Sequence, residues 1–218
     1  MHLLSGLAAH GRVVPAALAI AGLAVGAGGT AAILSSSGPS HAVSMPAAGR
    51  GSAMLEVASG TPVLTITVAR LGGTLLRVST PNSAPVRPVL AGSAPVMLSL
   101  VGASADDHGH PAADVVSVVL NAAVVWSLDL AAGTERTSAD LRGGRVGGIT
   151  VTAGSDILDV SLPRPTRTTA LRLAGGASQF LVSLPGGTVL TPSGWSTATS
   201  RFDIDAVAGV SRLTVSRW

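Results

Sequence analysis

The chain has 218 residues, 47% of them hydrophobic and only 11% charged, a length that suits one folded domain with an appended segment and excludes two large domains. It contains no cysteine, which excludes a disulfide framework, a thiolate metal site and a thiolate nucleophile. All fourteen basic residues are arginines that form no dense run. The isoelectric point near 11.2 therefore reflects residue choice, and nucleic-acid binding, which needs clustered cations, is not predicted.

An apolar segment lies near the N-terminus. Residues 13–34 carry no charge, and Arg12 precedes them. A helix of this length would span about 33 Å, enough to cross the hydrocarbon core of a membrane. We expect residues 1–34 to be either a cleaved signal peptide or a retained transmembrane anchor with Arg12 in the cytoplasm; a helix buried in the folded domain is a third alternative. Either of the first two would place the rest of the chain outside the cytoplasm.

The remaining chain divides by composition. Residues 35–53 are small, polar, Pro or Gly, which predicts a flexible linker. The stretch 79–93 contains three prolines and no period, and 102–114 is the most polar part of the chain, so we predict a loop at each. The domain of residues 54–218 otherwise reads as β-strands, with alternating or β-branched runs at 54–58, 63–68, 74–78, 96–101, 115–120 and 124–130.

Three stretches of the C-terminal half align without gaps, at residues 154–163, 176–185 and 209–218. Each begins with Gly, has an apolar residue four places on, Val two places further, and then Ser. The aligned apolar residues are Leu158, Phe180 and Leu213; the valines are Val160, Val182 and Val215; the serines are Ser161, Ser183 and Ser216. The glycines lie 22 and then 33 residues apart. A fixed period of short strands is typical of repeats that bury their apolar faces by stacking.

These patterns predict an all-β fold. The favoured architecture is a β-solenoid resembling a parallel β-helix, with short strands, Gly turns and about 22 residues per turn, preceded by one N-terminal hydrophobic helix. The alternative is a β-sandwich, which also has many short strands. The repeated sequence favours the solenoid, because a sandwich needs no such identity between its strands. The 33-residue step has no simple explanation in this scheme.

A polar loop contains the best candidate for a metal site. His108 and His110 alternate, so on an extended segment they would point the same way and could bind Zn²⁺ or Cu²⁺ together with a carboxylate, for which Asp106 is the candidate. The alternative is a solvated acidic loop with incidental histidines.

Other motifs predict no chemistry. Asp156, Asp159, Asp203 and Asp205 could form a carboxylate pair for glycoside hydrolysis. However, Asp203 and Asp205 alternate with apolar residues, which is typical of the solvent face of a half-buried strand. The glycine pairs in RGGRVGG, at 143–144 and 147–148, have no helix behind them to bind phosphate and are interpreted as turns. The chain has no nucleophile motif, so we predict neither catalytic residues nor a cofactor.

The strings VVWSLDLAAGT, ADLRGG, VTAGS, SLPRP, LAGGAS and SLPGG of residues 124–185, with the ending GWSTATSRFDIDAVAGVSRLTV, resemble actinobacterial exported proteins of unknown function. More loosely they resemble adhesin-type β-solenoid domains of bacterial envelopes. The resemblance covers about the last hundred residues. It implies a β-solenoid at the cell surface and implies no reaction.

The sequence thus predicts a non-enzymatic exported protein of the cell envelope, adhesin-like or a scaffold, whose partner is an envelope component or another protein. It would be bound to the membrane by a single span, or secreted if residues 1–34 are cleaved. Two alternatives remain: the extracellular sensory domain of a single-span protein, and a metal-binding envelope protein that uses the loop at 106–114.

Overall fold

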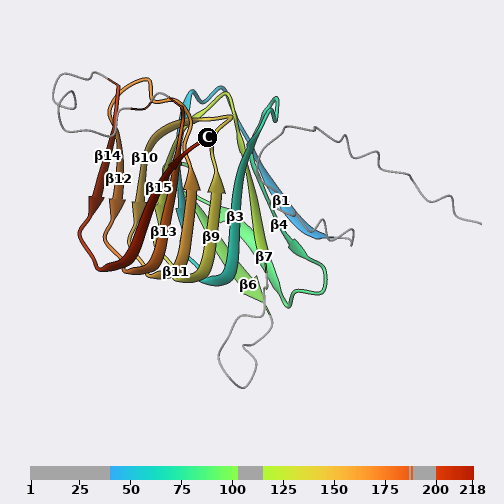
Figure 1. Ribbon diagram of the computed structural model, residues 1–218. Helices are drawn as coiled ribbons and strands as arrows, with labels where there is room; N and C mark the ends of the chain where they lie inside the picture. Colours follow the sequence, from blue (N-terminus) through green and yellow to red (C-terminus); the bar gives the residue numbers. More distant parts are fainter. Residues whose placement is uncertain (1–39, 103–114, 187, 189–199) are drawn as a thin grey trace, which may run out of the picture. The chain divides into compact units, whose positions relative to one another are not determined.

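The computed structural model describes residues 40–102, 115–186, 188 and 200–218, all of which belong to the unit Ser36–Trp218. The described residues form fifteen β-strands in two mixed sheets and no helix (Figure 1). The all-β prediction is confirmed. Within these residues there is accordingly no helix that could cross a lipid bilayer, and the apolar helix predicted within residues 1–34 lies outside them.

Two sheets contain the fifteen strands. The eight-stranded sheet has the order β1 (Ser40–Pro46), β4 (Thr74–Pro81), β7 (Val115–Asn121), β3 (Thr61–Ala69), β9 (Thr134–Asp140), β11 (Ser155–Ser161), β13 (Ala177–Leu184), β15 (Val210–Arg217). The seven-stranded sheet has the order β14 (Phe202–Ala206), β12 (Thr169–Leu173), β10 (Arg145–Val151), β8 (Val125–Leu130), β2 (Ser52–Val57), β6 (Val96–Gly102), β5 (Val86–Ala91).

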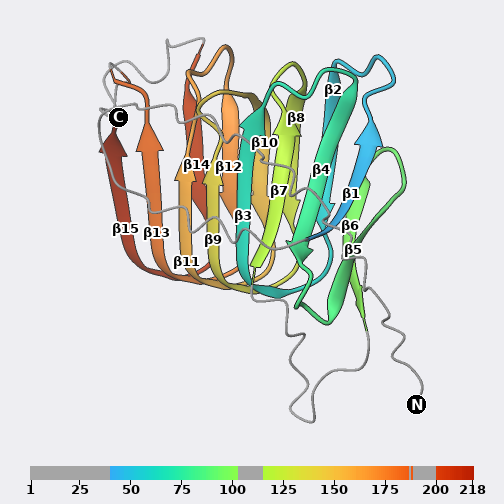
Figure 2. The ribbon, with the colours of Figure 1, turned by 90° about the vertical axis from the view of Figure 1, so that its right-hand side faces the viewer.

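From β7 to β15, consecutive strands alternate between the two sheets (Figure 2). Each of β10 to β15 pairs in parallel with the strand two places earlier in the chain. A parallel pair needs a crossover connection, and here the crossover is the intervening strand of the opposite sheet. Each short strand therefore buries its apolar side chains against the sheet that its chain neighbours occupy.

The register of β11, β13 and β15 confirms the predicted alignment of the three repeated stretches. Leu158 lies opposite Phe180, and Phe180 lies opposite Leu213. The offset is 22 residues in the first pair and 33 in the second, as in the sequence. The longer step corresponds to a longer connection between β13 and β14, most of which lies outside the described residues.

The positions of β2 and β3 in the sheets do not follow the order of the strands in the chain. β3 pairs with β7 and β9, and β2 pairs with β6 and β8, all in parallel. β2 and β3 come early in the chain, yet each lies between two strands that follow it in the sequence. Beyond this region the pairing becomes antiparallel, in the pairs β1–β4, β4–β7 and β5–β6. These antiparallel strands depart from the regular parallel coil that the period predicted.

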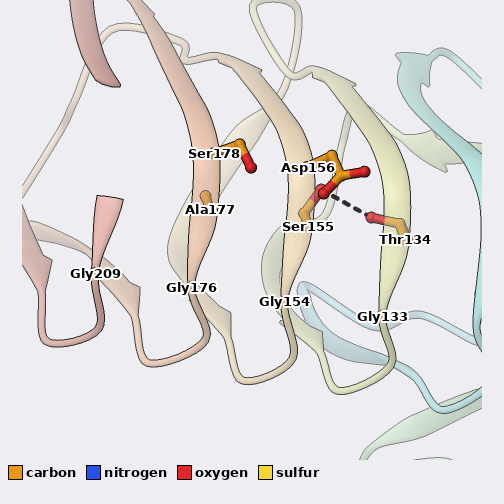
Figure 3. Close-up of a pocket in the computed structure, with 9 residues that line it drawn as sticks. All are labelled: Gly133, Thr134, Gly154, Ser155, Asp156, Gly176, Ala177, Ser178 and Gly209. Atoms are coloured by element: carbon orange, nitrogen blue, oxygen red, sulfur yellow. Dashed lines mark hydrogen bonds between the residues drawn. The ribbon is translucent and has the colours of Figure 1, made fainter. Parts of the chain in front are cut away.

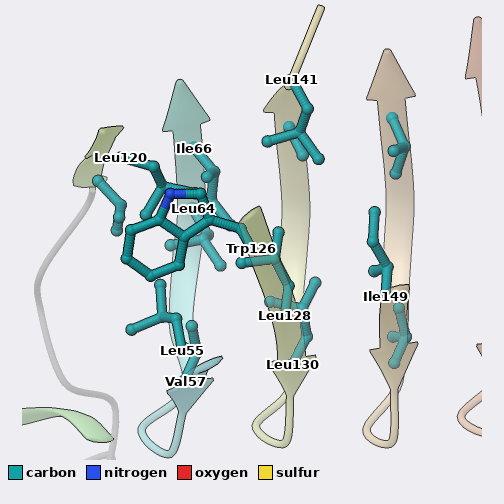
Figure 4. Close-up of a cluster of buried hydrophobic side chains, with 14 of the residues drawn as sticks. Leu55, Val57, Leu64, Ile66, Leu120, Trp126, Leu128, Leu130, Leu141 and Ile149 are labelled. Carbon is teal, nitrogen blue, oxygen red and sulfur yellow. The ribbon is translucent and has the colours of Figure 1, made fainter. Parts of the chain in front are cut away.

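The core lies between the two sheets and consists mainly of Leu, Val and Ile (Figure 4). In β7 and β8 buried residues alternate with half-exposed ones, because successive side chains of a strand point to opposite faces. Trp126 is the largest fully buried side chain, and its indole Nε1 donates a hydrogen bond to the carbonyl oxygen of Asn121 at 3.0 Å. The burial of each aliphatic side chain in this core stabilises the folded state by about 1.5–3 kcal/mol.

Two predictions about irregular segments are wrong in part. Residues 40–46, within the predicted linker 35–53, form β1, which pairs with β4 and packs Val43 and Met45 against the core. Residues 86–91, within the loop predicted at 79–93, form β5, an edge strand with a buried Val86. Edge strands accept proline and small polar residues, because one side of their backbone forms no ladder. Because such residues are also typical of loops, the sequence predicted no strand in either segment.

Candidate functional site

A furrow follows the turns that precede β9, β11, β13 and β15 (Figure 3). Each of these turns ends in a glycine, and the four lie side by side: Gly133, Gly154, Gly176 and Gly209. Backbone amides after the glycines donate to the next glycine carbonyl at 3.0–3.2 Å: Thr134 to Gly154, Ser155 to Gly176 and Ala177 to Gly209. The furrow has a volume of about 460 Å³, and its floor is mostly backbone because the glycines have no side chains.

The hydroxyl groups of Thr134 and Ser155, which line the furrow, form hydrogen bonds within the protein. Thr134 Oγ1 donates to Ser155 Oγ at 3.0 Å, and Ser155 Oγ donates to the carbonyl oxygen of Ile157 at 3.1 Å. Ser155 is also nearly buried. The exposed polar side chains in the furrow are therefore Asp156 and Ser178. One carboxylate and one hydroxyl above a glycine floor can make a few polar contacts but provide no catalytic constellation.

A second surface feature joins Asp140, Arg142 and Trp218. The Arg142 guanidinium binds the Asp140 carboxylate through two hydrogen bonds of 2.9 and 2.6 Å. Its Cζ atom lies 5.7 Å from the centre of the Trp218 ring, within cation–π range. The indole Nε1 of Trp218 donates to the carbonyl oxygen of Leu162 at 3.3 Å. Thr67, Val68 and Gly143 complete a depression of about 440 Å³.

Charge effects at this cluster follow from the same contacts. The side-chain hydrogen bond from Arg142 is the main cause that lowers the pKa of Asp140, and in turn the Asp140 carboxylate raises the pKa of Arg142. Asp159 lies on the adjacent strand, where burial raises its pKa; Arg136 opposes this effect and Asp140 adds to it. Both side chains of the Asp140–Arg142 pair are more than 40% exposed, so the ion pair contributes at most about 1 kcal/mol to stability.

A row of short polar side chains crosses the outer face of the eight-stranded sheet. The register places them on neighbouring strands in the order Thr67, Asp140, Ser161, Ser183, Ser216. The hydroxyl groups of Ser183 and Ser216 lie 2.9 Å apart, within hydrogen-bonding distance. Neighbouring strands are about 4.8 Å apart, so the row presents polar groups at a regular spacing on a sheet face.

The structure separates the other predicted carboxylates. Asp156 and Asp159 lie on β11 of one sheet, and Asp203 and Asp205 lie on β14 of the other. Asp203 and Asp205 are exposed while Phe202 and Ile204 pack against the core, which confirms the predicted solvent face of this strand.

The metal candidates Asp106, His108 and His110 lie outside the described residues, and the metal site stays a prediction. In the described ranges, no three His, Cys, Asp or Glu side chains are grouped so that they could hold a metal ion. Of the two glycine pairs in RGGRVGG, Gly143 and Gly144 form a turn, as predicted. Gly147 and Gly148 instead belong to β10, where the register shifts at a bulge.

Sequence reasoning missed the cluster of Asp140, Arg142 and Trp218. Arg142 and Trp218 are far apart in the sequence, and they meet only because β9, β11, β13 and β15 are adjacent in one sheet. The sequence signal that could have found them was Trp218 itself, the aromatic residue that ends the last repeated stretch where the two earlier stretches end in proline.

Comparisons with known proteins give one informative result. No protein-family profile and no curated protein sequence matches the chain. Among solved structures, the fold is similar to that of a "putative cell adhesion protein" from Clostridium sporogenes ATCC 15579, with a TM-score of 0.59 and 14% sequence identity. The match covers 83% of this chain and 99% of that chain. It shows a shared fold.

Proposed function

We propose that this chain is a non-enzymatic, exported protein of the cell envelope that acts as an adhesion or scaffold module. The observation that carries the proposal is the fold match, which spans almost the whole of a protein described as a "putative cell adhesion protein". The resemblance of residues 124–185 to actinobacterial exported proteins points to the same compartment. The apolar residues 13–34 would anchor the protein in the membrane or direct its secretion.

We also propose that the strands from β8 to β15 coil as a β-solenoid. Parallel pairing at offsets of 21 and 22 residues supports this architecture, as does the alternation of consecutive strands between two sheets. A solenoid of this kind is held by the same contacts at every turn and needs no disulfide bonds. It would present its outer faces rigidly to a partner.

The row of polar side chains on the eight-stranded sheet is the surface that suits such a role. Backbone pairing fixes the spacing of the row, and its side chains are short, so little conformational entropy is lost when a partner binds. The depression that Thr67, Asp140 and Trp218 line adds an aromatic ring beside the row. A surface of this kind would recognise a polar repeating partner, such as a polysaccharide or another envelope protein, through many weak contacts.

Localisation is tested with the full chain carrying a C-terminal epitope in its native cells. We expect the epitope in the membrane fraction or in the medium, and we expect protease added to intact cells to remove the cell-bound epitope. A protected epitope in the cytosol would contradict export.

Adhesion is tested by comparing cells that lack the protein with cells that express it or its variants. We expect Ser161→Glu combined with Ser183→Glu to reduce attachment, because both changes place charge within the polar row. The control is Thr150→Glu, on the outer face of the seven-stranded sheet, which should leave attachment unchanged. Equal attachment in all these strains would refute a role for the row.

A further inference from the structure

The two ends of the sheets differ in how their edges are protected. At one end the edge strands β1 and β5, which belong to different sheets, contact each other, and β5 also contacts β4. Both edge strands contain proline, which blunts a sheet edge. At the other end, within the described part of the chain, β15 pairs only with β13 and β14 only with β12 (Figure 2). Neither β14 nor β15 contains proline.

Apolar side chains are exposed at this second end. Leu213 lies in register with Leu158 and Phe180 on the neighbouring strands. It is nevertheless 50% exposed, whereas they are 0% and 1% exposed. Val215 repeats the pattern, at 38% against 0% for Val182. Both side chains face the same way as their buried counterparts, because the parallel register is unbroken. They are exposed because no described strand lies beyond them.

The outward faces of the two edge strands carry opposite charges. Asp203 and Asp205 are exposed on the outward face of β14, while Arg212 is exposed on the outward face of β15. β14 and β15 also run in opposite directions (Figure 1). A strand with the charge and the direction of β15 is therefore complementary to β14, and the reverse also holds.

We infer that this open end, defined by β14 and β15, binds the open end of a second copy of the chain. A two-fold axis parallel to the strands sets β15 of one copy antiparallel to β14 of the other, twice. This interface is isologous, so the same ladder of β15 with β14 forms twice, once on each side of the axis. Arg212 then faces the acidic strand of the partner copy, and Leu213 and Val215 continue the core across the junction.

Other arrangements of two copies are less favourable. A two-fold axis perpendicular to the sheets would place β15 beside β15 and β14 beside β14, which sets Arg against Arg and Asp against Asp. Stacking onto the β1/β5 end would meet edges that already contact each other, and it would produce filaments because it does not close.

The size of the end sets the expected affinity. Eight residues of β15 span about 26 Å, and two sheets about 10 Å apart with their outer side chains span about 20 Å. Each copy would thus bury roughly 500 Å², and the pair about 1,000 Å², near the lower limit for a specific interface. We expect dimers at micromolar concentration. The inference does not depend on the proposed adhesion, because it concerns only the end of the sheets.

Sedimentation velocity of the full chain in a nonionic detergent, over a concentration series, tests the inference. We expect a monomer–dimer equilibrium that Leu213→Glu weakens at least tenfold. The matched control is Val101→Glu, because Val101 is 51% exposed on β6, away from this end, and its substitution should leave the equilibrium unchanged. A chain that stays monomeric at about 100 μM, a series of larger oligomers, or equal effects of the two variants would overturn the proposal.

Charge reversal then tests the pairing of β14 with β15. Arg212→Asp alone and Asp205→Arg alone should each weaken dimerisation, because each places like charges in both ladders. An equimolar mixture of the two variants should restore it, because one ladder then has native charges and the other has both charges reversed. Stronger dimerisation of Arg212→Asp alone, or no recovery in the mixture, would contradict the proposed pairing.

Discussion

Leu158→Ala and Leu213→Ala form a matched pair of substitutions at aligned positions. They test whether Leu158 is covered by strands on both sides while Leu213, on the edge strand, is covered on one side. Leu158 is fully buried between neighbouring strands, so its truncation removes the transfer free energy and leaves a cavity. Substitutions of this kind cost about 3–4 kcal/mol. Leu213 is 50% exposed, so its truncation removes about half the transfer term and leaves no closed cavity. We expect a loss of about 1 kcal/mol there.

The assay is urea unfolding at equilibrium, followed by circular dichroism and extrapolated to water. The protein is kept below micromolar concentration, where the proposed dimer is dissociated and does not contribute to the free energy of unfolding. A difference between the two variants of about 2–3 kcal/mol is expected. Equal losses would refute the reasoning, because they would mean that Leu213 is covered as fully as Leu158.

Three further predictions concern one turn and the pH dependence of two carboxyl groups. Gly175→Ala should lower the free energy of unfolding by more than about 2 kcal/mol, because the added Cβ would overlap the backbone of the neighbouring turn. At the adjacent Gly176 an added Cβ meets only an ordinary contact of 3.4 Å, so Gly176→Ala should cost less than about 1 kcal/mol in the same urea assay. Because Arg142 lowers the pKa of Asp140, the stability that this carboxylate contributes is present at neutral pH and lost as pH falls through its folded-state pKa; Asp140→Asn should therefore be destabilising at pH 7, by at most about 1 kcal/mol, and neutral in strong acid. Burial raises the pKa of Asp159, so its carboxyl group loses its proton more readily in the unfolded chain, and stability falls as pH rises from the unfolded-state pKa to the folded-state pKa. Asp159→Asn should therefore raise the urea midpoint at pH 7 but not in strong acid.

The sequence predicted the repeated part of the fold well. In β11, β13 and β15 the same side-chain types recur at the same offsets, because stacked parallel strands give each position the same surroundings. The alignment of Leu158, Phe180 and Leu213 therefore predicted a register between strands that are distant in the sequence. The alternation of Asp203 and Asp205 with apolar residues predicted the exposed face of β14 for a similar local reason.

The antiparallel end was not predictable in the same way. β1 and β5 have no counterpart in the repeat, and their Pro and Ser residues are equally typical of loops. The place of β2 and β3 between later strands depends on contacts between distant segments, and no period in the sequence records it. The depression formed by Asp140, Arg142 and Trp218 was missed because it too exists only after the strands have stacked.

The most direct test of the account is to remove one complete turn. Deletion of residues 155–176 takes out β11 and β12, one strand from each sheet, and joins Gly154 to Ala177 so that β13 can pair with β9 and β14 with β10. If each turn is an interchangeable unit of a solenoid, the shortened chain should keep its β-sheet circular dichroism and unfold cooperatively, whereas the control deletion of residues 155–165, half a turn, should not fold. A shortened chain that is as unfolded as the control would contradict the solenoid.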